Sequence, residues 1–231
     1  QSRSSAASDV YKRQVNYLAL LGWSLSSDQD VFSLQEMVEH FDVRDVLANP
    51  ARFDVKKAEA INGSHIRLLG RDEFEERLIP YLREAGIVHE SLSDREREIL
   101  HAAAPLVQER MQLLGEAPGL LGFLFRADDQ IEIAEDARKQ LKESAPQVLD
   151  AARAALGDLQ TWEAAPIEQA LRDAIVEGLG IKPRLAFGPV RIAVSGARIS
   201  PPLFESLEIL GRDSSLARID ALRVELGGTA D

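Results

Sequence analysis

The 231-residue sequence contains no cysteine, which excludes disulfide bonds, thiol catalysis and zinc sites with cysteine ligands. This absence suits a reducing compartment, and we expect a cytoplasmic protein. The longest apolar runs, such as residues 18–23, fall far short of the ~20 residues that cross a bilayer, so no membrane contact is expected. Aromatic residues make up only 6% of the sequence, which argues against a sheet of stacking aromatic rings.

Motifs typical of enzymes are also missing. The sequence has no GxGxxG, P-loop, HExxH or GxSxG pattern. The four histidines, His40, His65, His89 and His101, are not at metal-ligand spacing. His101 follows Glu98 by three residues, which is more typical of a solvated helix face than of a catalytic pair. The sequence therefore predicts no catalytic residue, metal site or cofactor, and indicates a binding or interaction module.

Helical periodicity and helix-start patterns run through most of the chain. Capping-box patterns occur at Ser33–Glu36, Asp72–Glu75 and Ser93–Glu96, each followed by apolar residues three or four apart. The stretch from Ile133 to Leu156 predicts one long amphipathic helix, and another is expected from Pro166 to Gly178 or Gly180. Strict apolar–polar alternation is absent, so the predicted fold class is all-α.

Composition shifts divide the chain into a leader and three helical units. Residues 1–14, QSRSSAASDVYKRQ, resemble translated adapter sequence, the alternative being a natural disordered tail. The predicted helical units are residues 15–69, 70–132 and 133–231.

Charge is distributed unevenly in this acidic chain, whose formal net charge is −11. From Gly178 to Phe204 there is no Asp or Glu, whereas Lys182, Arg184, Arg191 and Arg198 all lie inside this acid-free segment. Arginine is suited to bidentate phosphate contacts and to stacking on bases, so the segment is a candidate anion-binding surface. The alternative is that these arginines form ion pairs with acidic residues of other helices.

A second feature of the acid-free segment is Ser200-Pro201-Pro202. A Ser N-cap followed by proline in the first helical turn predicts a helix N-terminus that can accept an anion or a base edge. Simple helix capping is the alternative reading.

Four segments in the same order resemble one known family: VNYLALLGWS (15–24), FDVKKAEAINGSHIR (53–67), YLREAG (81–86) and GPVRIAVSGARISPPLFESLEILGRDSSLARI (188–219). Together they resemble the C-terminal half of bacterial glutamyl-tRNA synthetases, class I enzymes that activate glutamate with ATP and Mg²⁺ and esterify it onto tRNA. The family's catalytic Rossmann domain and its two ATP motifs lie upstream of the matching region, and this chain contains neither motif.

The resemblance implies a tRNA-recognition portion that is inactive by itself, made of a stem-contact region (15–69) and two helical anticodon-binding domains (70–132 and 133–231). It implies a monomer that binds tRNA(Glu) and leaves open whether tRNA(Gln) is also charged. ATP and Mg²⁺ would belong to the parent enzyme.

The resemblance also assigns candidate contact residues. The family's anticodon contacts correspond to Arg110, Arg191, Ser200, Pro201 and Leu203. Stem or backbone contacts are expected at Asn62, His65, Arg67, Arg184 and Arg198, and helix packing is the alternative for Asn62, His65 and Arg67. An acidic helical protein–protein scaffold without RNA binding is the alternative function.

Overall fold

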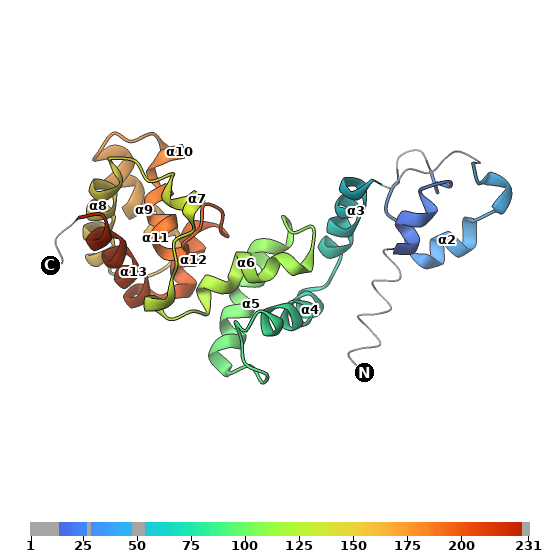
Figure 1. The fold of residues 1–231 in the computed structure, drawn as a ribbon, viewed down its shortest axis with the longest axis horizontal. Helices are drawn as coiled ribbons and strands as arrows, with labels where there is room; N and C mark the ends of the chain where they lie inside the picture. The colour runs from blue at the N-terminus through green and yellow to red at the C-terminus, as the bar shows by residue number, and fades with distance from the viewer. Residues whose placement is uncertain (1–13, 27–28, 48–53, 228–231) are drawn as a thin grey trace. The chain divides into compact units, whose positions relative to one another are not determined.

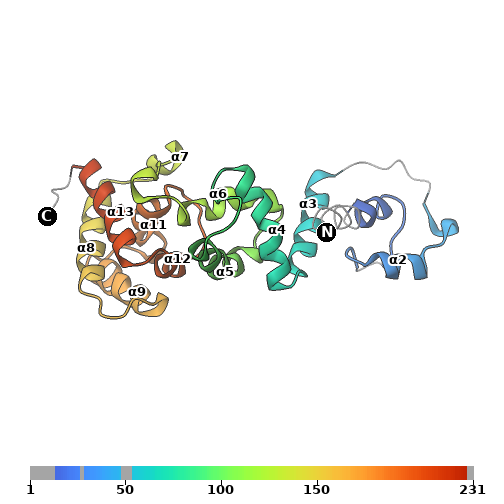
Figure 2. The same cartoon turned by 90° about the horizontal axis from the view of Figure 1, so that it is seen from below.

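The structure is a computed structural model that describes residues 14–26, 29–47 and 54–227 (Figures 1 and 2). These residues form helices, turns and loops without any strand, so the predicted all-α class is confirmed. The predicted leader, residues 1–14, lies outside the described residues except for Gln14. Within the same ranges, no helix is long and apolar enough to cross a membrane.

The described residues form a series of helices. In chain order the elements are α2 (Leu34–His40), η1 (Val43–Asp45), α3 (Val55–Arg67), α4 (Arg71–Glu84), α5 (Asp94–Gln108), η2 (Leu114–Glu116), α6 (Ala117–Leu121), η3 (Gly122–Leu124), η4 (Asp128–Gln130), α7 (Glu135–Arg138), α8 (Ala145–Gly157), α9 (Ala164–Leu171), the π-helix η5 (Arg172–Glu177), α10 (Pro183–Ala186), α11 (Gly188–Ser195), α12 (Leu203–Leu210) and α13 (Arg212–Glu225).

The chain folds as two compact units. Unit 1 comprises the described residues up to Tyr81 together with Val107–Glu116, and unit 2 comprises Leu82–Leu106 together with the described residues from Ala117 onward. The predicted boundaries at 69/70 and 132/133 stay a prediction.

In unit 1 the segment NYLALLGW (16–23) contributes the buried side chains of Asn16, Tyr17 and Trp23. Trp23 is buried and packs edge-to-face on Phe32, with 5.5 Å between ring centroids. Asn16 is also buried, and its side-chain amide donates to the carbonyl of Asp30 (3.0 Å) while its Oδ1 accepts from the Phe32 amide (3.2 Å). A buried amide is stable only when its donors and acceptors are satisfied, so Asn16 fixes the path of the segment that leads into α2.

Unit 2 has its core where α8, α9, α11, α12 and α13 pack on one another (Figure 1). Each of these helices contributes fully or almost fully buried aliphatic side chains, among them Val148, Ile167, Val190, Leu207 and Ile219. Apolar burial of this kind is the main favourable contribution to folding, at about 25 cal/mol per Å².

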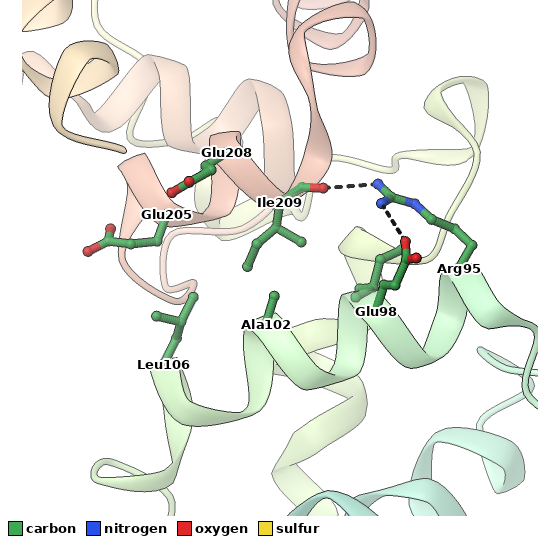
Figure 3. Close-up of a pocket in the computed structure, with 8 residues that line it drawn as sticks. Arg95, Glu98, Ala102, Leu106, Glu205, Glu208 and Ile209 are labelled. Atoms are coloured by element: carbon green, nitrogen blue, oxygen red, sulfur yellow. Dashed lines mark hydrogen bonds and ion pairs between the residues drawn. The ribbon is translucent and has the colours of Figure 1, made fainter. Parts of the chain in front are cut away.

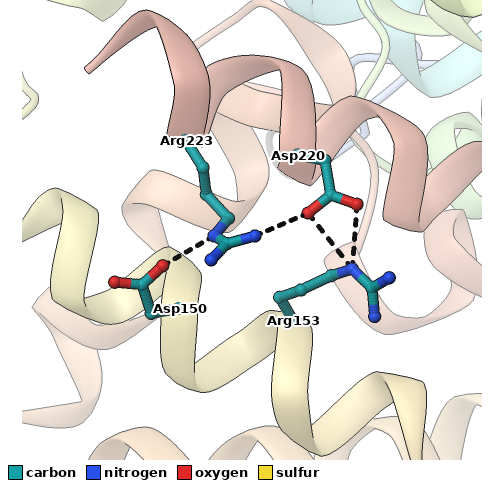
Figure 4. Close-up of polar contacts among 4 residues, drawn as sticks. All are labelled: Asp150, Arg153, Asp220 and Arg223. Carbon is teal, nitrogen blue, oxygen red and sulfur yellow. Dashed lines mark hydrogen bonds and ion pairs between the residues drawn. The ribbon is translucent and has the colours of Figure 1, made fainter. Parts of the chain in front are cut away.

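Polar contacts also join α8 to α13 at the edge of this core (Figure 4). Arg223 Nε donates to Asp150 (2.6 Å) and its Nη1 to Asp220 (2.9 Å), and Asp220 also accepts from Arg153 Nε (2.9 Å). Hydrogen bonds from Arg223, first to Asp150 and then to Asp220, raise the pKa of this guanidinium. The alternating charges hold α8 and α13 in register.

The prediction of a single helix from Ile133 to Leu156 is wrong, because the structure has two helices there, α7 and α8, with a break between them. Pro146 occupies the first turn of α8, where its missing amide costs nothing, whereas inside a continuous helix it would break the hydrogen-bond ladder. The helix predicted from Pro166 is present as α9, which continues as the π-helix η5 and ends at Gly178.

Two of the three predicted capping boxes are confirmed. Ser33 and Ser93 each accept from the amide of the Glu three residues later, and that Glu carboxylate accepts from the serine amide in return. The box predicted at Asp72 is wrong, because α4 already begins at Arg71 and Asp72 lies inside its first turn.

Gly196 ends α11 in the left-handed conformation, with φ of +71°. A Cβ atom at this position would lie 2.2 Å from the carbonyl oxygen of Glu132, and the Gly196 carbonyl accepts from the Ala134 amide (2.8 Å). Only glycine permits both the conformation and the close approach of residues 132–134.

Arg218 of α13 is a buried cation with 3% relative exposure. Its guanidinium donates to the carbonyls of Phe123 (2.9 Å), Val194 (2.9 Å) and Arg126 (2.8 Å) and to the carboxylate of Asp128 (2.7 Å). Burial lowers the pKa of this group and the Asp128 contact acts in the opposite direction, but an arginine stays charged in proteins. One side chain thus connects α13 to α11, η3 and η4.

We predict that Arg218→Met lowers the free energy of unfolding by about 3–5 kcal/mol, because it leaves buried carbonyls without donors and Asp128 without its partner. Thermal and urea unfolding would measure this loss. The exposed Arg97 provides the control, since Arg97→Met should change stability by less than about 0.5 kcal/mol. Equal stability of the two variants would contradict the role assigned to Arg218.

Glu96 is a mostly buried carboxylate at the start of α5. Burial alone would raise its pKa, but hydrogen bonds from the Ser93 amide and hydroxyl and from the His89 amide and ring outweigh burial and bring the pKa of Glu96 to about 2. A carboxylate whose pKa is lower in the folded than in the unfolded chain stabilises the fold above its unfolded pKa.

Glu96→Ala should therefore cost about 1–3 kcal/mol of stability at neutral pH, where the parent carboxylate is ionised and accepts these bonds. The difference between parent and variant should shrink as pH falls from about 4.5 toward 2. Urea unfolding at several pH values would measure it, with the exposed Glu90→Ala as control. A stability difference that does not change between pH 7 and pH 2.5 would refute this assignment.

Candidate nucleic-acid interface

The acid-free segment (residues 178–204) forms α10, α11 and the turn that leads into α12. Proline starts each of the two helices, as Pro183 in α10 and Pro189 in α11, and Gly196 ends the second. Apolar side chains of α11, including Val190 and Val194, are buried in unit 2. The segment is therefore anchored on one side by the core.

Arg191 lies in α11 and is partly buried. Its Nη1 donates to the hydroxyl of Ser200 and to the carbonyl of Pro201 (2.9 Å), and Ser200 Oγ in turn donates to the Pro201 carbonyl (2.9 Å). The structure thus brings together three of the predicted anticodon contacts. Arg191 fixes the shape of the turn before α12.

The N-cap predicted at Ser200 is wrong. Helix α12 begins at Leu203 with Pro202 as its N-cap, and Ser200 uses its hydroxyl within the turn. The residue before a proline is disfavoured in the helical conformation, and Ser200 and Pro201 both precede one, so the helix starts two residues later than expected.

The residues of this turn are well packed. Ser200 and Leu203 are 4% and 3% exposed, and Pro201 is buried as well. The turn is therefore a rigid edge whose form depends on Arg191.

Other cations of the acid-free segment are more accessible. Lys182 is exposed, and Arg198 is about half exposed and pairs with Asp136 at 3.4 Å. A long ion pair between exposed side chains is weak, so it leaves most of the Arg198 charge available to an anion. Arg184 lies in α10, and its side chain is not among those described.

Two aromatic side chains in the same segment were not predicted as site residues from the sequence. Phe187 and Phe204 are partly exposed and meet edge-to-face, with 5.3 Å between ring centroids and an interplanar angle of 83°. The guanidinium of Arg172, from η5, lies 5.8 Å from the Phe187 centroid. The low overall aromatic content argued against base stacking, so the sequence did not predict this cluster. Both rings nevertheless lie inside the acid-free segment.

Arg110 belongs to unit 1, where it follows the end of α5 and is exposed. Its amide donates to the carbonyl of Val107 (3.0 Å), so its backbone continues the last helical turn.

The predicted stem contacts on α3 face other parts of unit 1. Asn62 donates to the carbonyl of Gln112, and His65 Nε2 donates to Asn16 Oδ1 (3.0 Å). Arg67 donates to the carbonyl of Glu109 (3.3 Å) and to the Ser64 hydroxyl (3.0 Å). These bonds are those expected from the packing alternative. Those of Asn62 and Arg67 hold α3 against residues 109–112, and that of His65 joins α3 to Asn16.

A different cleft in unit 2 has the opposite charge (Figure 3). It lies between α5 and α12, has a volume of about 460 Å³ and is lined by Glu98, Glu205 and Glu208. Its one arginine, Arg95, already donates to the Ile209 carbonyl (3.1 Å) and lies 3.6 Å from Glu98. Three carboxylates would repel a phosphate, so this cleft does not fit RNA.

In residues 14–26, 29–47 and 54–227, no three His, Asp or Glu side chains are grouped so that they could hold a metal ion.

The chain is similar to glutamate–tRNA ligases. It is 71% identical over 212 residues to that of Kocuria rhizophila and 64% identical over 209 residues to that of an Arthrobacter species. These regions cover 92% and 90% of this chain but only 42% of each relative, so the chain spans less than half of their length. The predicted resemblance to this enzyme family is confirmed.

A crystal structure of a glutamate tRNA ligase from Elizabethkingia meningosepticum has the same fold, with a TM-score of 0.76 and 22% identity over 93% of this chain and 41% of that one. The family model for the anticodon binding domain matches residues 73–223, which include most of unit 2 and the whole acid-free segment. Since this match covers well over half of the sequence, the chain belongs to the family of anticodon-binding domains.

Proposed function

We propose that this chain is the tRNA-recognition part of a glutamate–tRNA ligase and that its acid-free segment meets the anticodon loop. The observation that carries the proposal is the coincidence of two independent features. The region matched by the anticodon-binding model contains the one long stretch without carboxylates, and there Arg191, Ser200 and Pro201 converge.

The physical reason is electrostatic. RNA carries one negative charge per nucleotide, and a carboxylate near the loop would repel it, which accounts for a local absence of acids in a chain of net charge −11. Single-stranded bases of RNA loops also stack on aromatic rings and on guanidinium planes. The cluster of Phe187, Phe204 and Arg172 offers both beside the rigid turn.

Each candidate residue has a role in this proposal. Arg191, Ser200 and Pro201 set the form of the turn that meets the loop, and Leu203 supports this turn from the core. Arg110, which lies in unit 1, contacts the edge of an anticodon base through the N–H donors of its guanidinium group. Backbone contacts are proposed for Asn62, His65, Arg67, Arg184 and Arg198.

The activity of a complete ligase is part of the same proposal. Activation of glutamate with ATP and Mg²⁺ would reside in the portion of the relatives that this chain does not match, and no residue of this chain is assigned to it. We propose tRNA(Glu) as the partner, with tRNA(Gln) as a further candidate, a monomeric state and a cytoplasmic location.

An acidic helical scaffold that binds proteins is the second candidate. The charged cleft in Figure 3 and the overall acidity favour it. The acid-free segment and the family match favour RNA.

Arg191→Ala and Arg110→Ala should each weaken binding of a tRNA(Glu) transcript by about 1–3 kcal/mol, the contribution of one good bidentate base contact. This corresponds to roughly 5- to 150-fold in Kd. Filter binding would measure the affinity, and circular dichroism would confirm that the variants fold.

Arg97→Ala is the matched control, because it removes an exposed arginine of unit 2 outside the segment. Ser200→Ala tests the turn alone, since it removes one acceptor of Arg191 without removing the guanidinium. Binding of both arginine variants at wild-type affinity would show that the residue assignments are wrong.

Total tRNA should shift the mobility of the chain in a native gel at low salt, and the shift should fade between 50 and 200 mM salt. The same chain should show no ATP–pyrophosphate exchange. A scaffold would give no shift at any salt concentration, and measurable exchange would contradict the assignment of activation to the unmatched portion.

A further inference from the structure

The cleft between α5 and α12 is lined by one face of each helix (Figure 3). Its lining residues recur at three- and four-residue spacing, which places them on a single stripe of each helix. On α5 they are Arg95, Glu98, Ile99, Ala102 and Leu106, and on α12 they are Glu205, Glu208 and Ile209. All of these residues belong to unit 2, so the cleft lies within one unit.

The floor of this cleft is aliphatic. In Figure 3 the side chains of Ala102 and Leu106 point from α5 toward α12, and that of Ile209 points back toward α5. Ala102 is exposed, and Leu106 and Ile209 are partly exposed. The stretch from Arg95 to Leu106 extends for about 16 Å along α5, which matches three turns of a second helix. A groove of this kind accommodates the apolar face of an amphipathic helix.

The charges at the rim define which helix would fit. Glu98, Glu205 and Glu208 line the cleft, and the only cation among its lining residues is Arg95. The guanidinium of Arg95 already donates to the Ile209 carbonyl (3.1 Å) and lies 3.6 Å from Glu98. An acidic or phosphate-bearing partner would be repelled, whereas lysine or arginine side chains would be attracted.

A buried oxygen of Glu205 gives an independent indication of a partner. Within the described residues, Glu205 Oε2 is buried and accepts no hydrogen bond. A buried acceptor without a donor is unfavourable, and such atoms are rare in native proteins. The N–H groups of a lysine or arginine would supply both the missing donor and the opposite charge.

We propose that the cleft between α5 and α12 binds an amphipathic helix of another protein. Its aliphatic side chains pack on Ala102, Leu106 and Ile209, and its lysine or arginine side chains contact the carboxylates. The cleft shares no residue with the acid-free segment, so this inference does not depend on which residues contact tRNA.

The test measures binding of a helical peptide to the 231-residue chain by fluorescence anisotropy. The labelled probe has about 18 residues, or five helical turns, with leucines three and four apart and arginines beside them. Ala102→Arg should raise its Kd about 10-fold or more, because the new side chain fills the floor and repels the arginines. Glu205→Gln should raise the Kd about 3-fold or more, because a charge-assisted hydrogen bond is lost.

Ala154→Arg is the matched control, because Ala154 is an exposed alanine of α8 in unit 2 and the substitution adds the same charge away from the cleft. Glu90→Gln is the corresponding control for Glu205→Gln, since Glu90 is exposed and does not line the cleft. Both should bind the peptide like the parent chain, and circular dichroism would verify that all variants fold.

A second peptide of the same composition, with its leucines scattered around the helix, tests whether the apolar face matters. The parent chain should bind it more weakly than the first peptide. If both peptides bind equally, or if Ala102→Arg binds like Ala154→Arg, the attraction is only a general effect of charge and the proposal is overturned.

Other occupants would give different results, each of which also contradicts the proposal. If sedimentation velocity shows a dimer for the parent chain and a monomer for Ala102→Arg, the occupant is a second copy. If Ala102→Arg weakens binding of a tRNA(Glu) transcript more than Ala154→Arg does, the occupant is RNA. Arg191→Ala should leave peptide binding unchanged, so the peptide and tRNA experiments can fail independently.

Discussion

In unit 2, the buried guanidinium of Arg218 connects segments of the chain by hydrogen bonds, in addition to the packing of the aliphatic core. Arg218 donates to the carbonyls of Phe123, Arg126 and Val194 and to the carboxylate of Asp128. It thus joins α13 to residues 123–128 and to α11, which are far apart in sequence. One of the acceptors is the carbonyl of Val194, one turn after Arg191 along α11. The position of α11, and with it the turn before α12, therefore depends on a charge that is almost fully buried.

In unit 1, a neutral side chain connects distant segments in the same way. Asn16 connects the segment before α2 to α3 by accepting from Phe32 and His65 and donating to Asp30. Both units thus contain a buried polar residue that forms several hydrogen bonds to segments distant in sequence. A polar residue of this kind specifies one arrangement of its neighbours, because any other arrangement would leave buried donors or acceptors unpaired.

Features set by local chemistry could be predicted from the sequence, and features set by distant partners could not. The helical class and the boxes at Ser33 and Ser93 followed from periodicity and from side chains three residues apart. The break before α8 could also have been read from Pro146, but the alanine-rich periodicity outweighed it. The convergence of Arg191 with Ser200 and the stacking of Arg172 on Phe187 depend on tertiary packing, so only the lack of acids around them was visible beforehand.

The close approach of residues 132–134 to Gly196 has a consequence for inherited variation in this protein. Residues 132–134 pass so close to the end of α11 that no chiral amino acid fits, and the same crossing lies a few residues from the turn that Arg191 holds. In a genetic screen for alleles that fail to read RNA, changes at Gly196 would be recovered alongside changes in true contact residues. A map of such alleles drawn on the surface alone would therefore mistake a backbone requirement for a binding site.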